Sequence, residues 1–295
     1  MSDSAVNLRR KISSAGELES VVRTMKAMAA SSIGQYENAV RSLDDYYRTV
    51  QLGLMACLPQ HASPTRLKES GAIGVVVFGS DQGLVGQFNE VMAEFVVDQL
   101  AKLPGKKLVW TIGERIESRL AEHAILPEKS FALPNSISLI TPLVGQVLTE
   151  IEMQREKNAI AQVYLFFNRP RSGAIYTPVS QRLLPLDAAW RHELLMSTWP
   201  SANLPEILND PEQTLLALIR EYLFVSIFRS CTESLASENA CRLAAMQRAE
   251  KNIDELLEDL NRNFHRLRQS GIDEELFDLI SGFEAMSRTQ TGPLE

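Results

Sequence analysis

The chain has 295 residues, 45% of them hydrophobic and 23% charged, which allows one large domain or two modest ones. Its net charge is −7 and its acidic and basic residues are interspersed, so it lacks the extended basic face that nucleic-acid binding requires. The three cysteines (Cys57, Cys231 and Cys241) have neither disulfide nor metal-ligand spacing, and no apolar run approaches the roughly 18 residues that span a bilayer. We therefore expect a protein of a reducing compartment without a disulfide framework, zinc site, signal segment or transmembrane helix.

The first predicted element is a long helix from about Ser4 to Leu58. Its apolar residues recur at steps of three or four positions: Leu8, Ile12, Ala15, Leu18, Val22, Met25, Ala29, Ile33, Tyr36, Val40, Leu43, Tyr47, Val50 and Leu54. A stripe that stays on one helix face for so long is typical of a coiled-coil seam. Residues 1–58 should therefore pair with a second helix of similar length.

The middle of the chain, residues 72–208, is expected to fold as an α/β domain after a polar linker at residues 59–71. Strands are predicted at residues 73–78, 107–112, 161–168 and 174–184, and helices at residues 88–103, 114–124 and 143–158. Because strands alternate with helices, the domain should be Rossmann-like, with a doubly wound and largely parallel sheet that ends in an antiparallel edge strand.

The loop Ser80-Asp-Gln-Gly-Leu-Val-Gly86, between the first strand and the first helix of this domain, is the candidate ligand site. It lacks both the glycine spacing of a dinucleotide fingerprint and the Gly-Lys-Ser/Thr of a P-loop. A tight turn in which Ser80 or Asp81 caps backbone N–H groups explains it, with nucleotide binding as the alternative. No histidine or second carboxylate lies beside Asp81, and the four histidines are scattered. We therefore predict no catalytic residue, no cofactor-binding residue and no metal ligand.

A second long helix is predicted from about Pro211 to Met286, within a C-terminal segment of residues 209–295. Its seam positions are Leu215, Ile219, Tyr222, Leu243, Met246, Ala249, Ile253, Leu256, Leu260, Phe264 and Leu267. Because both long helices leave the same middle domain, they should run antiparallel, with facing residue numbers that add up to about 267 and a paired length of roughly 80 Å. Val22 then lies beside Met246.

In this register the N-terminal helix ends opposite about Phe264. The C-terminal helix continues beyond that point with an apolar surface that has no partner in the chain. The uncovered side chains are Ile272, Leu276, Phe277, Leu279, Ile280, Phe283 and Met286. An apolar surface of this size predicts that something outside the chain covers it.

Six stretches, in this order and spacing, resemble the gamma subunit of the F-type ATP synthase over nearly the whole chain. They are Leu8-Arg-Arg-Lys-Ile12, Met25-Lys-Ala-Met-Ala-Ala-Ser31, Ser80-Asp-Gln-Gly-Leu-Val-Gly-Gln-Phe-Asn89, Gln181-Arg-Leu-Leu-Pro-Leu186, Ser234-Leu-Ala-Ser-Glu-Asn-Ala240 and Ser281-Gly-Phe-Glu-Ala285. The resemblance implies a non-catalytic central rotor stalk, whose coiled coil fills a ring of alpha and beta subunits while its α/β domain rests with the epsilon subunit on the membrane c-ring.

The same resemblance implies which residues contact those partners. Met25, Arg242 and Gln269 occupy positions that would face beta subunits, and Leu276, Ile280 and Phe283 belong to the tip that the top of the ring would hold. It also implies a peripheral protein on the cytoplasmic side of a bacterial inner membrane, which couples ion flow to ATP synthesis or hydrolysis.

The chain departs from the family pattern at several positions. Ser32 and Gly34 replace basic residues after the Ala-Ala-Ser stretch, Gln82 and Val85 replace an arginine and a cysteine of the loop motif, and Gly271 weakens the C-terminal helix. These departures suggest a divergent branch, such as an alternate ATPase complex. Two other functions remain open from the residues alone: a coiled-coil adaptor with an α/β head, and a small-molecule enzyme that uses the loop at Ser80.

Overall fold

The structure is a computed structural model that describes residues 3–58, 71–157, 159–171, 174–196, 198–201, 203, 205–208 and 210–289. The chain divides into two compact units. We call residues 1–28 with 244–295 the helical unit and residues 29–243 the head unit, and describe each by itself. The predicted linker lies outside the described residues except for Gly71.

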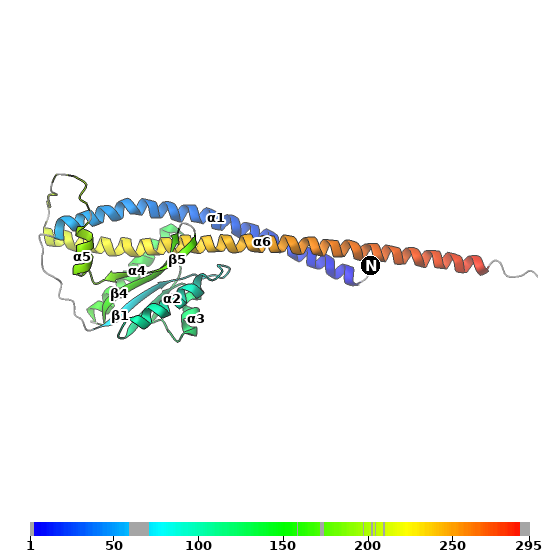
Figure 1. Cartoon of the computed structure of the whole chain (residues 1–295), viewed down its shortest axis with the longest axis horizontal. Helices are drawn as coiled ribbons and strands as arrows, with labels where there is room; N and C mark the ends of the chain where they lie inside the picture. Colours follow the sequence, from blue (N-terminus) through cyan, green and yellow to red (C-terminus); the bar gives the residue numbers. More distant parts are fainter. Residues whose placement is uncertain are drawn as a thin grey trace, which may run out of the picture. The chain divides into compact units, whose positions relative to one another are not determined.

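Two long helices confirm the strongest sequence prediction. Helix α1 covers Asp3–Cys57 and helix α6 covers Pro211–Thr289, so each contributes one part to the helical unit and another to the head unit (Figure 1). Helix α6 begins with Pro211, whose missing N–H costs nothing at a first helical position. The carboxylate of Asp210 accepts a hydrogen bond from the backbone N–H of Gln213 at 3.4 Å, which caps this end.

The head unit is built on a mixed five-stranded sheet in the order β3-β2-β1-β4-β5. The strands are β1 (Ala72–Phe78), β2 (Lys107–Ile112), β3 (Lys129–Phe131), β4 (Ile160–Arg171) and β5 (Ala174–Leu184). Strands β1 to β4 pair in parallel, and β5 is an antiparallel edge strand, so the predicted Rossmann-like α/β fold is confirmed.

Helices cover both faces of this sheet (Figure 1). On one face lie α2 (Phe88–Lys102) and α3 (Glu114–Glu122), which bury their apolar sides against β1, β2 and β4. The other face packs against the short 3-10 helix η2 (Ile137–Leu139), α4 (Ile140–Glu156), α5 (Ala188–Leu195) and the head-unit parts of α1 and α6. The central strands β1 and β2 are therefore buried on both sides, as their nearly continuous apolar sequences require.

Within the head unit, α1 and α6 run antiparallel. The Tyr46 hydroxyl donates a 2.8 Å hydrogen bond to Glu221, and Arg229 forms a 3.0 Å ion pair with Asp44. Asp44 precedes Tyr46 on α1, whereas its partner Arg229 follows Glu221 on α6. The two helices therefore run in opposite directions, as predicted. Figure 1 shows the two helices side by side above the sheet of the head unit.

Candidate functional site

The helical unit is held together by an apolar seam between α1 and α6. Val22, Met246 and Ile253 are buried in one cluster, and the partly buried Met25 and Leu257 pack against it. Val22 and Met246 share this cluster, as the predicted antiparallel pairing requires, but Glu250 pairs with Arg23 and Lys26, so the facing residue numbers add up to more than the predicted 267 here. Burial of these apolar side chains supplies the attraction between the two helices.

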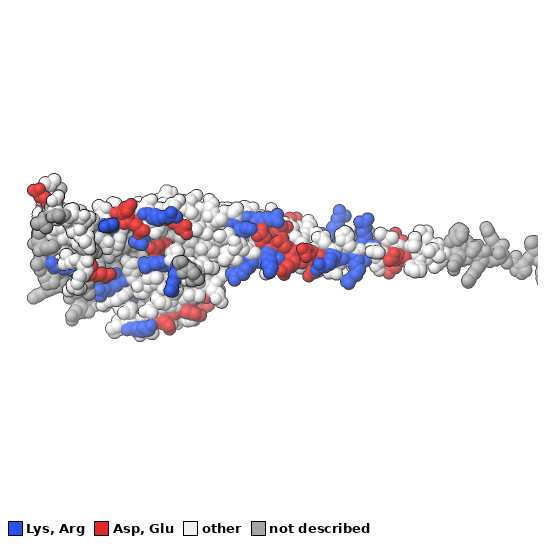
Figure 2. All heavy atoms as spheres, turned by 45° about the horizontal axis from the view of Figure 1, so that its top comes forward, with Lys and Arg blue, Asp and Glu red and all other residues white. Residues whose placement is uncertain are grey.

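Ion pairs border this seam. Lys26 Nζ lies 2.6 Å from one carboxylate oxygen of Glu250, and Arg23 Nε lies 3.4 Å from the other. The hydrogen bond from Lys26, opposed in part by desolvation, holds the pKa of Glu250 below its ordinary value. Figure 2 shows basic and acidic side chains intermixed on the visible face of this unit.

Two predicted seam positions are wrong. Leu18 and Leu256 are 54% and 49% exposed, and Leu257 occupies the seam in place of its neighbour. For Leu256 the reason is helical periodicity. An α-helix has about 3.6 residues per turn, so Leu257, four positions after the buried Ile253, points closer to the seam than Leu256, three positions after it.

The far end of α6 is uncovered, as predicted. Five large apolar side chains, at 49–73% exposure, follow each other there: Ile272, Leu276, Phe277, Leu279 and Ile280. We call these five side chains the tip. The side chains of Phe283 and Met286, assigned to the same surface from the sequence, lie outside the described residues. Among described residues of the helical unit, the tip is an apolar surface without a packing partner.

The residues that would contact partners lie in different surroundings. Met25 is half-buried in the seam of the helical unit, whereas Gln269 is exposed on α6 of the same unit. Arg242 belongs to the head unit, where its side chain is only 14% exposed and forms a 2.6 Å ion pair with Glu238. Burial raises the pKa of Glu238, and the adjacent Arg242 partly offsets that rise. Arg242 therefore already has a partner within its own chain.

The loop at Ser80 is a structural junction. One carboxylate oxygen of Asp81 accepts the backbone N–H of Glu114 at 3.0 Å, and the other accepts that of Leu133 at 3.2 Å. The predicted capping by Asp81 is confirmed, although the helix it caps is α3 and not the helix that follows the loop. A Cβ at Gly79 would lie 2.2 Å from the Cβ of Ile116, so only glycine lets β1 approach α3 here.

Sequence reasoning missed an ionic cluster in the head unit. Glu233 on α6 is buried, and its two oxygens accept hydrogen bonds from Arg169 on β4 at 2.7 Å and from Arg229 at 2.8 Å. Arg229 and Glu233 are four positions apart on one helix, a spacing that could have suggested their pair. Arg169 is 64 positions away, and only the fold brings it there.

Membrane-spanning helices and metal sites can both be recognised from the structure. Along the described part of the chain, none of the helices combines the length and apolarity that crossing a membrane takes. The same residues contain no cluster of three His, Cys, Asp or Glu side chains placed to hold a metal ion.

Comparison with known proteins gives a consistent result. The profile of a family described as ATP synthase matches residues 4–286. The ATP synthase gamma chain of Polynucleobacter asymbioticus is 25% identical over 96% of this chain and 99% of its own length. The ATP synthase gamma chain of Granulibacter bethesdensis is 28% identical over 95% of this chain and 98% of its own.

Solved structures share the fold. A chain of the Euglena gracilis mitochondrial ATP synthase, in a structure of OSCP, F1 and c-ring, superimposes with a TM-score of 0.67 at 17% identity, covering 99% of this chain and 97% of that one. A chain of the central stalk and c-ring structure of the Tetrahymena thermophila mitochondrial ATP synthase gives 0.56 at 21% identity, over 78% and 99%.

Proposed function

The chain belongs to the ATP synthase family, and we propose that it is the gamma subunit, the central rotor stalk of an F-type ATP synthase. In this role it couples ion flow through a membrane ring to ATP synthesis or hydrolysis on beta subunits, and it is not itself catalytic. The observation that carries the proposal is the uncovered apolar tip on α6, in a chain whose family match extends to residue 286.

The exposed apolar tip favours a partner protein that surrounds the end of α6. Its side chains would each contribute on the order of 1.5–3 kcal/mol if fully buried, and exposed together they are a strong reason to associate. A ring of alpha and beta subunits offers such a cover. The unpaired end of α6 is short enough to be only marginally stable as a helix in water, so the same partner would also keep it helical.

The head unit supports a structural role for the α/β domain. Both oxygens of Asp81, the only carboxylate of the loop from Ser80 to Gly86, accept hydrogen bonds from backbone N–H groups. A carboxylate held in this way is poorly placed to take a proton from a substrate. We propose that the head unit instead contacts the epsilon subunit and the c-ring.

We propose further details that the sequence suggests. The protein would lie on the cytoplasmic side of a bacterial inner membrane, as a peripheral subunit of a housekeeping or alternate complex. Its segments would be an N-terminal coiled-coil helix (1–58), a linker (59–71), the α/β domain (72–208) and a C-terminal helix with its tip (209–295). The proposed contacts with alpha and beta subunits are Met25, Arg242, Gln269, Leu276, Ile280 and Phe283.

Co-expression with the alpha, beta and epsilon subunits of the same organism tests the proposal. A rotor subunit should co-purify with all three, and amide hydrogen exchange over residues 265–282 should slow markedly on assembly. Strong protection of these amides in the free chain, unchanged by the partners, would contradict the role of the tip. Co-purification with unrelated proteins alone would favour the coiled-coil adaptor instead.

A further inference from the structure

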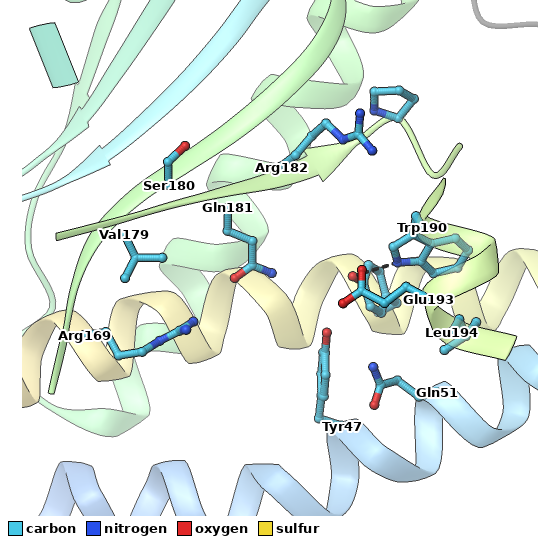
Figure 3. Close-up of a pocket in the computed structure, with 12 residues that line it drawn as sticks. Tyr47, Gln51, Arg169, Val179, Ser180, Gln181, Arg182, Trp190, Glu193 and Leu194 are labelled. Carbon is cyan, nitrogen blue, oxygen red and sulfur yellow. Dashed lines mark hydrogen bonds between the residues drawn. The ribbon is translucent and has the colours of Figure 1, made fainter. Parts of the chain in front are cut away.

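The head unit contains a pocket of about 530 Å³ that none of the roles above uses. Its walls come from α1, β4, β5, α5 and α6, and its volume lies in the range of small-molecule sites. Figure 3 shows Gln181 of β5, Glu193 of α5 and Tyr47 of α1 pointing into the same opening. β5 and α5 follow each other in the chain, whereas Tyr47 comes from the first helix, far away in the sequence.

Three aromatic rings form one wall of the pocket. The ring centroids of Tyr47 and Tyr222 are 5.7 Å apart, and those of Trp190 and Tyr222 are 5.3 Å apart. Trp190 Nε1 donates a 3.0 Å hydrogen bond to the Tyr222 hydroxyl, which fixes the indole in place (Figure 3). Burial raises the pKa of Tyr47, so this phenol stays neutral. The faces of such rings carry partial negative charge and attract cations.

The charges around the pocket leave one carboxylate uncompensated. Of the two lining arginines, Arg182 pairs with Asp187 at 2.8 Å and Arg169 with Glu233 at 2.7 Å. Glu233 is shared with Arg229 at 2.8 Å, and Arg229 in turn pairs with Asp44 at 3.0 Å, so these three arginines face three carboxylates. Glu193 has no ion-pair or hydrogen-bond partner among the described residues. The net charge of the groups around the pocket is therefore negative, although two guanidinium groups contribute to the lining.

We propose that this pocket binds an ammonium or guanidinium group. Glu193 would form the ion pair, the ring of Trp190 would contact the cation, and the amide oxygen of Gln181 would accept a hydrogen bond from it. The ring of Tyr47 already carries the Arg229 guanidinium, 5.7 Å from its centroid, and would only border the ligand. Two sources share this chemistry: a free diamine, and a lysine or arginine side chain of a partner subunit. Because Glu193 is exposed, we expect weak binding of a free amine, with a dissociation constant in the millimolar range.

Titration of the purified full-length chain with putrescine at low salt tests the proposal, followed by the NMR signal of the Trp190 indole N–H. Glu193→Gln should weaken binding about threefold to fivefold, the upper end for an exposed ion pair. Glu193→Lys should abolish it. The matched control is Glu152→Gln, which removes an exposed carboxylate from α4, and it should leave binding unchanged.

Several results would overturn the proposal: no shift of the Trp190 signal at tens of millimolar putrescine, equal binding by Glu193→Lys, or a response to inorganic phosphate in its place. Equal melting temperatures of the variants would show that the substitutions do not cause misfolding.

The source of the cationic group is then decided on the assembled complex. If putrescine no longer binds there and Glu193→Lys weakens assembly, the ligand is a partner's side chain; if putrescine still binds, it is a free amine. The titration of the free chain does not depend on the rotor role.

Discussion

Replacing Leu279 with alanine separates the tip's role in assembly from any role in folding. Leu279 is 73% exposed, so most of its surface is free to be buried by a partner. If full burial of a leucine contributes about 1.5–3 kcal/mol, the exposed share is worth about 1–2 kcal/mol. That corresponds to a loss of about fivefold to thirtyfold in affinity for the alpha and beta subunits.

The free chain should barely respond to the same change. A surface substitution away from packed features usually costs less than about 0.5 kcal/mol, and alanine is a good helix former. The matched control is Ile253→Ala in the seam of the helical unit, where the side chain is only 7% exposed. There we expect a loss of about 2–5 kcal/mol in the free energy of unfolding of the free chain.

Two measurements decide between these expectations: urea denaturation of the free chain, and titration of the chain into alpha and beta subunits. The reasoning fails if Leu279→Ala destabilises the free chain as much as Ile253→Ala does, because the tip would then pack within the chain. It also fails if Leu279→Ala leaves the affinity for the ring unchanged, because the tip would then make no contact that matters there.

Three further changes test the packing of the two units. Gly79→Ala should cost at least about 1–3 kcal/mol of stability by thermal melting, because the added Cβ would overlap a buried isoleucine of α3. With the native cysteines replaced by alanine, Val22→Cys and Met246→Cys should form an intrachain disulfide, visible as a gel shift, because both positions share one buried cluster. Lys129→Met should reduce the loss of stability in acid: the Lys129 hydrogen bond depresses the pKa of Glu150, so its stabilisation is present above the ordinary value of 4.5 and is lost as the pH falls below it.

Each change has a matched control. Gly145→Ala adds a Cβ in open space within α4 and should be neutral or slightly stabilising, so equal losses at both glycines would refute the steric argument. Leu18→Cys paired with Met246→Cys should stay reduced, because Leu18 faces solvent, and faster oxidation of this pair would refute the register. Lys106→Met removes an exposed lysine, and an acid profile altered to the same degree would show that Lys129 does not act through Glu150.

Long periodic elements were predictable because many residues report the same property. The seam of α1 repeats over the length of the helix, so a single outward-facing residue such as Leu18 does not change the prediction. The exposed tip was predictable for a related reason: a difference in length between two paired helices leaves a surplus at one end. The family-derived contacts of Met25, Arg242 and Gln269 stay predictions, since they depend on partner chains.

Short elements were not predictable from their own residues. Strand β3 has three residues, of which only Phe131 is buried, and that is too few for a period of two to show. It forms because β2 offers a parallel edge beside it. Helix α5 covers eight residues and follows a capping Asp187, whose side chain accepts the N–H of Trp190, but this signal is common in loops as well.

The proposed cation pocket depends on the kind of information that sequence patterns omit. Without α5 there is no reason to place Glu193 near Tyr47, and without the pairing of α1 with α6 there is no reason to place Tyr47 beside Tyr222. The negative balance depends on pairs between elements: Glu233 is shared by Arg169 and Arg229, Arg229 also pairs with Asp44, and Asp187 pairs with Arg182. A charge count along the chain cannot reveal which carboxylate is left over, whereas a list of ion pairs in the folded head unit does. Surfaces set by helix length can therefore be anticipated from sequence, but sites set by charge pairing have to be found in the fold.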